Sequence, residues 1–160
     1  MLQRPSIAML AMFLLQLVWP AAAQTNPPAQ GAYRPGLGDM MTMTVQPRHI
    51  KLAAAARAHN WIYAAYELHE LQEAFARIAA VWPEWQHLPI AAMIKFNVAD
   101  PVSALDAAIK AKDSAKFDAG FKLLTESCDS CHQAAGREMI VIKVPGEAPF
   151  PDQDFAPRHD

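Results

Sequence analysis

Five consecutive residues near the carboxyl end of the sequence combine two thiols with an imidazole. They are Cys128, Asp129, Ser130, Cys131 and His132, and the two cysteines are the only ones in the chain. Thiols three residues apart lie about one turn apart on a helix, so each can add to one of the two vinyl groups on the same porphyrin edge and form a thioether. The histidine that follows then lies beneath the iron as its proximal ligand. The C-x-x-C-H pattern therefore predicts one covalently attached haem c.

Other uses of a cysteine pair agree less well with the sequence. A thioredoxin-like redox pair belongs near a βαβ pattern, and the chain shows no convincing alternation of apolar and polar residues. A structural zinc site needs about four ligands, and the sequence has no second Cys or Cys/His pair at finger spacing. A disulfide across two intervening residues would close too small a loop to stabilise a fold. We therefore expect haem attachment.

The amino terminus has the pattern of a signal peptide. Arg4 precedes an apolar stretch from Ile7 to Val18, and Ala21–Ala23 supply the small residues that a signal peptidase needs. We expect cleavage after Ala23 and export to the periplasm, which agrees with the site of haem attachment outside the bacterial cytoplasm. The alternative is an uncleaved anchor. Because a membrane span takes roughly 20 apolar residues and this stretch is shorter, we do not expect membrane anchoring.

Length and composition predict one folded domain flanked by irregular segments. The chain has 160 residues, a formal net charge of −2 and no basic block, so nucleic acid is not an expected partner. After the signal peptide (1–23), prolines and small polar residues indicate a flexible leader over 24–35. The folded domain is expected over 36–136. A proline-rich tail over 137–160 carries two aromatic residues, Phe150 and Phe155, and we expect it to pack on or near the domain.

The domain is rich in alanine and follows helical spacing, which predicts an all-α fold with four helices. The first is expected over 37–58, with a kink or break at Pro47 because proline removes a backbone hydrogen bond. The second begins after an N-cap at Asn60 and ends at Pro83. Its apolar residues follow at spacings of 4, 3, 4, 3 and 4: Ala64, Leu68, Leu71, Phe75, Ile78 and Trp82.

The third helix is expected to open with Asp100 as N-cap and Pro101 in the first helical position. The residues before it, 83–99, form a connection with at most a short helix around 90–96. The fourth helix should begin at Asp113 or Ser114 and end at Gly136. Its inward stripe runs at spacings of 4, 3, 4 and 3 through Phe117, Phe121, Leu124, Cys128 and Cys131. Both thiols therefore face the interior, where the haem should lie.

These features together resemble the class II c-type cytochromes, the four-helix-bundle group that includes cytochrome c prime. The resemblance rests on a signal peptide, four helices and one C-x-x-C-H late in the last helix, and it covers residues 37–136. It implies an antiparallel four-helix bundle with haem attached near the end of the fourth helix and covered by the first helix. Pro47 and the tail depart from the simplest class II pattern. Class II bundles often pair through their first two helices, so a homodimer is one expectation; burial within one chain is the other for Trp61, Tyr63 and Tyr66.

The resemblance places any sixth iron ligand on the first helix. Four candidates lie there: Met40, Met41, Met43 and His49. At about 100° per residue, Met41 falls within roughly 40° of the inward-facing Val45, Met40 lies about 100° away from Met41, and Met43 points to the far side. His49 lies about 80° from Met41, at the edge of the inward stripe. Met41 is therefore the first expectation for the distal ligand, His49 is the alternative, and an empty site behind Val45 is the third.

The ligand set determines the expected function. A saturated iron predicts an electron-transfer protein that works with redox partner proteins and is not an enzyme. An open iron predicts a five-coordinate protein that binds NO or CO. A haem peroxidase would need a distal acid–base group, for which His49 is the only obvious candidate. Arg48 and Arg137 are candidates for the haem propionates because a guanidinium pairs well with carboxylates, with ordinary surface charges as the alternative reading.

Overall fold

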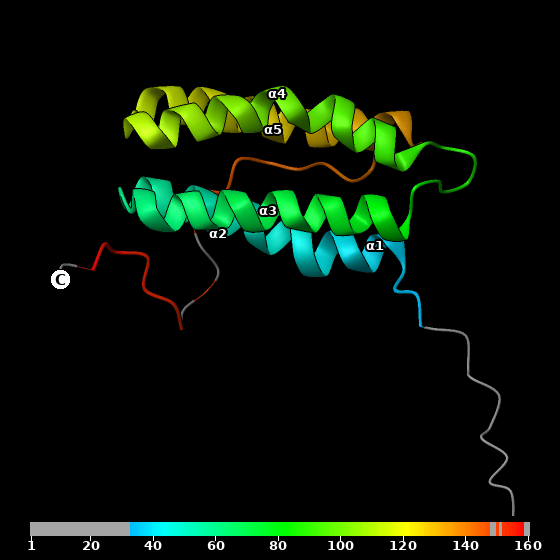
Figure 1. Ribbon diagram of the computed structural model, residues 1–160, viewed down its shortest axis with the longest axis horizontal. Coiled ribbons are helices and arrows are strands. Elements are labelled where there is room, and N and C mark those ends of the chain that lie inside the picture. The colour runs from blue at the N-terminus through cyan, green and yellow to red at the C-terminus, as the bar shows by residue number, and fades with distance from the viewer. Residues whose placement is uncertain (1–32, 148–149, 151, 159–160) are drawn as a thin grey trace, which may run out of the picture. The chain divides into compact units, whose positions relative to one another are not determined.

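The computed structural model describes residues 33–147, 150 and 152–158, so the predicted signal peptide (1–23) and most of the leader (24–35) lie outside the described residues. Its helical segments are α1 (Leu37–Met40), η1 (Met41–Val45), α2 (Gln46–Arg57), α3 (Trp61–Val81), α4 (Ile90–Ala111) and α5 (Ser114–Ala134). The first three follow one another without interruption and form one helix in three parts. Four helices therefore pack antiparallel, α2 on α3, α3 on α4 and α4 on α5 (Figure 1). The predicted all-α fold is confirmed.

Capping residues set the ends of the helices as predicted. The Asn60 side chain accepts a hydrogen bond from the Tyr63 N–H at 3.1 Å and begins α3. Asp113 accepts one from the Lys116 N–H at 3.0 Å and begins α5. After α5, Gly136 adopts the left-handed region with φ of 64°. Glycine reaches this conformation without a steric cost, so the chain leaves the helix at this residue.

The expected start of the third helix at Asp100 is wrong. The helix α4 is continuous from Ile90 to Ala111, and Pro101 lies buried inside it. Ile90 and Ile94 are buried on the same side of the helix as the predicted inward residues Val102, Leu105 and Ile109. Burying each isoleucine contributes about 1.5–3 kcal/mol, which together offsets the roughly 3 kcal/mol that an interior proline costs.

The break predicted at Pro47 takes the form of a π-helical turn, η1. The N–H of Gln46 bonds the carbonyl of Met41, five residues earlier, and α2 then starts with Pro47 in its first turn. In a regular helix the proline ring would clash with the carbonyl four residues before it. A wider turn removes this clash at the cost of one extra residue, so the residues before η1 are rotated relative to a straight helix.

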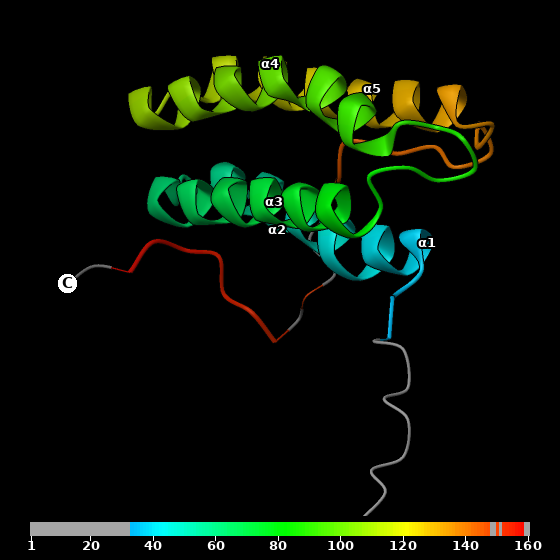
Figure 2. The ribbon, with the colours of Figure 1, turned by 45° about the vertical axis from the view of Figure 1, so that its right-hand side comes forward.

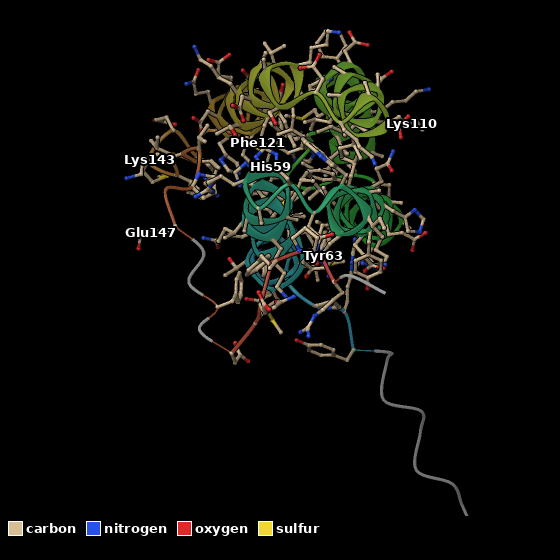
Figure 3. All side chains as sticks on the ribbon, turned by 90° about the vertical axis from the view of Figure 1, so that its left-hand side faces the viewer. His59, Tyr63, Lys110, Phe121, Lys143 and Glu147 are labelled. Atoms are coloured by element: carbon tan, nitrogen blue, oxygen red, sulfur yellow. The ribbon has the colours of Figure 1, made fainter. Side chains whose placement is uncertain are left out.

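The core draws on every helix. Its largest fully buried apolar side chains are Leu52, Leu71, Ile78, Leu105, Phe121 and Leu124. Figure 3 shows Phe121 between the helices, whereas Lys110 and Lys143 point outward. Within residues 33–147, no helix combines the length and apolar character needed to cross a membrane.

The segment after α5 contacts the first two helices of the bundle. Arg57 donates to the carbonyls of Pro145 and Gly146, and the Asn60 amide lies 3.2 Å from the Phe155 carbonyl. The Phe155 ring lies 5.8 Å from that of Tyr63. The described parts of the tail from Pro145 onward thus contact α2, α3 and the N-cap residue Asn60 of α3, with hydrogen bonds to backbone carbonyls among these contacts.

Candidate functional site

The C-x-x-C-H residues occupy the last turns of α5. Cys128 and Cys131 are free thiols, and both are half-buried at the end of the inward stripe that Phe121 and Leu124 begin. The Cys128 thiol donates to the Leu124 carbonyl at 3.3 Å. The helix therefore presents the two thiols about one turn apart with the imidazole directly after them, because their spacing matches the helical repeat.

The surroundings keep both thiols protonated. Burial raises the pKa of Cys128 to about 12, and the negative charge of Asp129 adds to this effect. Burial also raises the pKa of Cys131. A redox-active or metal-binding cysteine needs a thiolate, which a lowered pKa would favour. The pair instead offers S–H groups, which add across carbon–carbon double bonds to give thioethers.

The His132 ring is oriented by the chain that follows the helix. Its Nδ1 lies 3.1 Å from the carbonyl oxygen of Ile140. A carbonyl only accepts hydrogen bonds, so Nδ1 carries the proton and Nε2 keeps its lone pair. Histidines that ligate metals usually have this arrangement, with the second nitrogen donating to a carbonyl or carboxylate. His132 is therefore in the tautomer that an iron ligand requires.

His49, on α2, packs directly against α5. It is buried, its Nε2 lies 3.0 Å from the Thr125 hydroxyl, and its ring lies 4.5 Å from that of Phe121. Because the hydroxyl of Thr125 donates to the Phe121 carbonyl at 2.9 Å, the His49 Nε2–H is the donor to Thr125. Burial lowers the pKa of His49 to about 4, so the ring is neutral at pH 7.

The contact between His49 and Thr125 also sets the register between α2 and α5, which run antiparallel (Figure 1). From Thr125 to His132, α5 advances about 10 Å, and from His49 back to Met41 the first helix advances about 12 Å. η1 and α1 therefore lie at the level of His132. Figure 2 likewise shows α1 and the C-terminal end of α5 at the same end of the bundle.

The π-helical turn changes which methionine is best buried. Met40 is buried with 8% of its surface exposed, Met41 is half-buried against the core, and Met43 is 76% exposed. The sequence-based expectation that Met40 lies away from the inward face is wrong, because it assumed a straight helix. The extra residue in η1 brings Met40 onto the side of Val45.

The two arginines expected near haem propionates have other partners. Arg48 forms ion pairs with Glu67 and Glu70, each at 3.1 Å. The guanidinium of Arg137 lies 5.0 Å from the Trp85 ring centre, and it also donates to the Gly136 carbonyl.

Glu67 is a buried charged residue that was not predicted from the sequence. Its side chain is fully buried and bonds Arg48 through both oxygens, at 3.1 and 3.3 Å. The signal was present in the sequence, since Glu67 follows Ala64 by three residues and precedes Leu71 by four, and so lies on the inward face of α3. A carboxylate on an inward stripe requires a cation opposite it.

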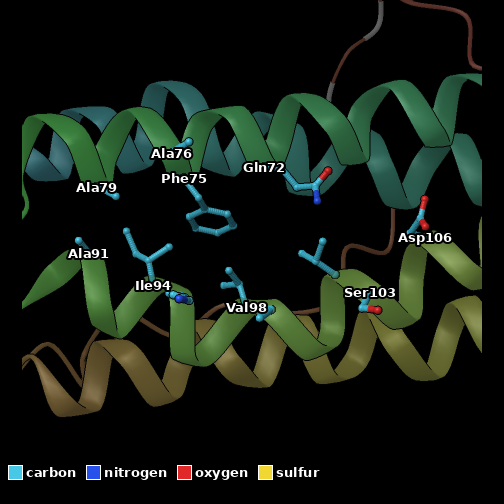
Figure 4. A pocket seen from close by; sticks show the side chains of 12 residues that line it. Gln72, Phe75, Ala76, Ala79, Ala91, Ile94, Val98, Ser103 and Asp106 are labelled. Atoms are coloured by element: carbon cyan, nitrogen blue, oxygen red, sulfur yellow. The ribbon is translucent and has the colours of Figure 1, made fainter.

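Two open grooves lie beside α4. One, of about 540 Å³, separates α3 from α4 and is lined by Phe75, Ile94 and Val98 among others, with no residue of the C-x-x-C-H sequence (Figure 4). The other, of about 420 Å³, lies between α4 and α5 and includes Phe96 and Ser130. Only the second borders the attachment sequence, since Ser130 lies between its two cysteines.

The side chains that would hold a covalently bound haem lie together at the end of α5. Two S–H groups and an imidazole with a free Nε2 lie on one end of one helix, and large apolar side chains nearby in the chain are exposed: Met139, Ile140 and Val141. No group of three or more His, Cys, Asp or Glu side chains in the part of the chain that the structure describes is placed to hold a metal ion. Comparison of the chain with protein-family models, curated proteins and solved structures gave no match.

Proposed function

We propose that the chain is a periplasmic monohaem c-type cytochrome of the class II kind, and that it transfers electrons. One observation carries the proposal: C-x-x-C-H lies on a single helix whose His132 donates from Nδ1 to the Ile140 carbonyl at 3.1 Å. Two thiols supply the thioethers, and the free Nε2 supplies the iron ligand. The four-helix fold provides an apolar interior beside this end of α5.

Each residue of the site has a separate task. Cys128 and Cys131 hold the cofactor through thioethers, and His132 is the proximal ligand. Bound haem supplies an iron that changes its oxidation state by one electron. The Ile140 carbonyl fixes the imidazole plane and makes the ligand more basic, because it draws the Nδ1 proton. The apolar core of the bundle lies beside this end of α5, where Cys128, Cys131 and His132 are half-buried.

The sixth ligand in this proposal is a methionine of the first helix. Met41 remains the prediction from helical spacing, and Met40 joins it because η1 buries it on the side of Val45. A methionine ligand raises the reduction potential of the haem. His49 is less suited to this task, since its Nε2–H is engaged by Thr125 and ligation would require the other tautomer.

Attachment is tested by producing the full chain in the periplasm of a bacterium with a haem-attachment system. We expect the mature mass to include one haem and the alkaline pyridine spectrum to be that of a haem with two thioether bonds. Cys128→Ala and Cys131→Ala should each shift this spectrum toward that of a haem with one free vinyl group. Ser130→Ala, within the same motif, is the matched control and should change nothing. A mature wild-type protein without the added haem mass would overturn the proposal.

A second candidate is a five-coordinate protein that binds NO or CO. It is favoured by the engagement of His49 with Thr125 and by the burial of Val45, since together they leave an apolar distal side if neither methionine ligates. The spectrum of the reduced protein with and without carbon monoxide separates the two candidates. A low-spin spectrum that carbon monoxide leaves unchanged supports the electron carrier. Immediate and complete binding supports the gas-binding protein and excludes a saturated iron.

Redox partner proteins and a homodimer both remain predictions. On α3, Ile62 is 88% exposed and Tyr66 is 49% exposed, whereas Trp61 and Tyr63 are half-buried within the chain. In such a homodimer, these two exposed side chains would lie at the contact between the two protomers. Sedimentation of the holoprotein at two concentrations tests this, and a monomer at both would exclude the homodimer.

A further inference from the structure

We propose that Asp129 is a positioning residue for His132, because it ties the chain segment that carries the Ile140 carbonyl to α5. Asp129 is one of the two residues between the cysteines of the attachment sequence, a place where the pattern itself requires no particular side chain. The proposal rests on the proposed function, in which His132 ligates iron.

Two hydrogen bonds hold this segment against one turn of the helix. The Asp129 Oδ1 accepts from the Ile142 N–H at 2.7 Å, and His132 Nδ1 donates to the Ile140 carbonyl at 3.1 Å. Asp129 and His132 are three residues apart on α5 and therefore neighbours on its surface. Their partners are two residues apart in the segment. A shift of Ile142 would therefore carry the Ile140 carbonyl with it.

The local sequence brings the segment to this position but does not hold it there. Gly136 ends the helix, and the Arg137 N–H bonds the His132 carbonyl at 2.7 Å. A turn follows, closed by the Ile140 N–H on the Arg137 carbonyl at 2.9 Å, and sends the chain back along α5.

Side-chain burial holds the segment only in part, through the half-buried Ile142. Met139 is 72% exposed and Val141 is 66% exposed, so neither is packed in the core. The next described contact along the chain is the one that Arg57 makes with the carbonyls of Pro145 and Gly146. Between the turn and the Arg57 contact, the backbone of the segment is held by the hydrogen bond from the Ile142 N–H to Asp129. Its acceptor is charged, which makes this kind of bond stronger than a neutral one.

The consequence for the iron follows from the basicity of the ligand. A hydrogen bond from Nδ1 to a fixed acceptor increases electron donation from Nε2 and stabilises the oxidised iron. Releasing the segment weakens that bond, so the reduction potential rises. Removing the carboxylate also raises the potential through loss of a negative charge near the iron. Asn keeps an oxygen acceptor but has no charge, so the comparison of Asp129→Asn with Asp129→Ala isolates the hydrogen bond.

The experiment uses the holoprotein with four changes: Asp129→Asn, Asp129→Ala, Ile142→Pro, which removes the N–H donor, and the combination of Asp129→Ala with Ile142→Pro. Reduction potentials are measured by titration, and amide hydrogen exchange at Ile142 is followed by NMR. We expect the Ala variant to have a higher potential than the Asn variant and an Ile142 amide that exchanges at least tenfold faster. Ile142→Pro should raise the potential, and it should add nothing further to Asp129→Ala.

Equal potentials and equal Ile142 exchange in the Asn and Ala variants would overturn the proposal, and so would additive effects of Asp129→Ala and Ile142→Pro. If Asp129→Ala does not fold, Ile142→Pro tests the same contact alone, and an unchanged potential then overturns it. Failure of the proposed function is distinguishable, because a wild-type chain without haem shows no haem absorption, whereas Ile142 exchange is measurable in either case.

Discussion

Replacing His49 by glutamine should remove a large part of the acid sensitivity of the fold. His49 is buried against α5, and its pKa falls from 6.5 to about 4 because burial disfavours the charged ring. Between these two values the unfolded chain binds a proton that the folded chain excludes. Stability contributed by this group is therefore complete above pH 6.5 and is lost as the pH falls toward 4. Glutamine does not titrate, and its amide can still donate to Thr125.

The magnitude follows from the size of the shift. A difference of about 2.5 pKa units corresponds to a limiting loss of roughly 3 kcal/mol, since each unit is worth about 1.4 kcal/mol. Between pH 7 and pH 4.5 the wild-type protein should lose about 2 kcal/mol of its free energy of unfolding through this one group. Losses from all other titrating groups are common to the wild type and the variant, so they cancel in the difference.

The assay is urea-induced unfolding of the holoprotein, followed by helical circular dichroism at pH 7 and pH 4.5. The free energy of unfolding should fall by about 2 kcal/mol more in the wild type than in His49→Gln. His69→Gln, on an exposed position of α3, is the control and should behave as the wild type. If His49→Gln and the wild type lose the same free energy between the two pH values, the burial argument is refuted.

Three further changes test other parts of the structure. Arg48→Ala leaves the fully buried Glu67 carboxylate without its cation and should cost about 3 kcal/mol in urea unfolding at pH 7; a loss below 1 kcal/mol would contradict the ion-pair account. Gly136→Ala places a side chain at a φ of 64° and should cost about 1 kcal/mol by thermal unfolding, and no change would mean that the turn is not required. Met40→Ala should alter the low-spin spectrum of the reduced haem if Met40 ligates, whereas the exposed Met43→Ala should not; equal spectra in both would leave Met41 as the methionine candidate.

The parts of the fold that depend on local patterns were predictable from the sequence. The N-cap at Asn60 was predictable, and the cap of α5 was narrowed to Asp113 or Ser114, because such side chains satisfy backbone donors of the first turn, an interaction within four residues. Gly136 was recognised as the end of α5 because few other residues accept its conformation. The inward stripe through Phe117, Phe121 and Leu124 was likewise readable, since one helical period determines it.

The errors arose where tertiary packing outweighed a local signal. Asp100 followed by Pro101 has the features of a helix start, but burial of Ile90 and Ile94 continues the helix through the proline. Pro47 correctly indicated a break, yet the sequence did not show that it would be a π-helical turn, and this turn decides that Met40 rather than Met41 is the better buried methionine. At both prolines, the result depends on whether the free energy gained by burying side chains exceeds the cost of the lost backbone hydrogen bond.

The candidate site, too, was only partly predictable from the sequence. The spacing of Cys128, Cys131 and His132 placed two thiols and an imidazole on one helix, which the structure also shows. The carbonyl that orients His132 comes from Ile140, eight residues later and beyond the helix. Helical periodicity ends at Gly136, so no pattern in the sequence relates these two residues. The burial of His49 against Thr125 is a contact between distant segments and was equally hidden.

The bond between His132 and the Ile140 carbonyl has a consequence for protein engineering. A short C-x-x-C-H peptide grafted onto the helix of another protein would bring both thiols and the imidazole, but it would leave the imidazole free to rotate. The smallest transferable unit in this chain runs from Cys128 through Ile142, because only that length includes the glycine that ends the helix, the turn, and both backbone groups that α5 holds. A designer who copies fifteen residues rather than five would carry over the orientation of the iron ligand together with its attachment.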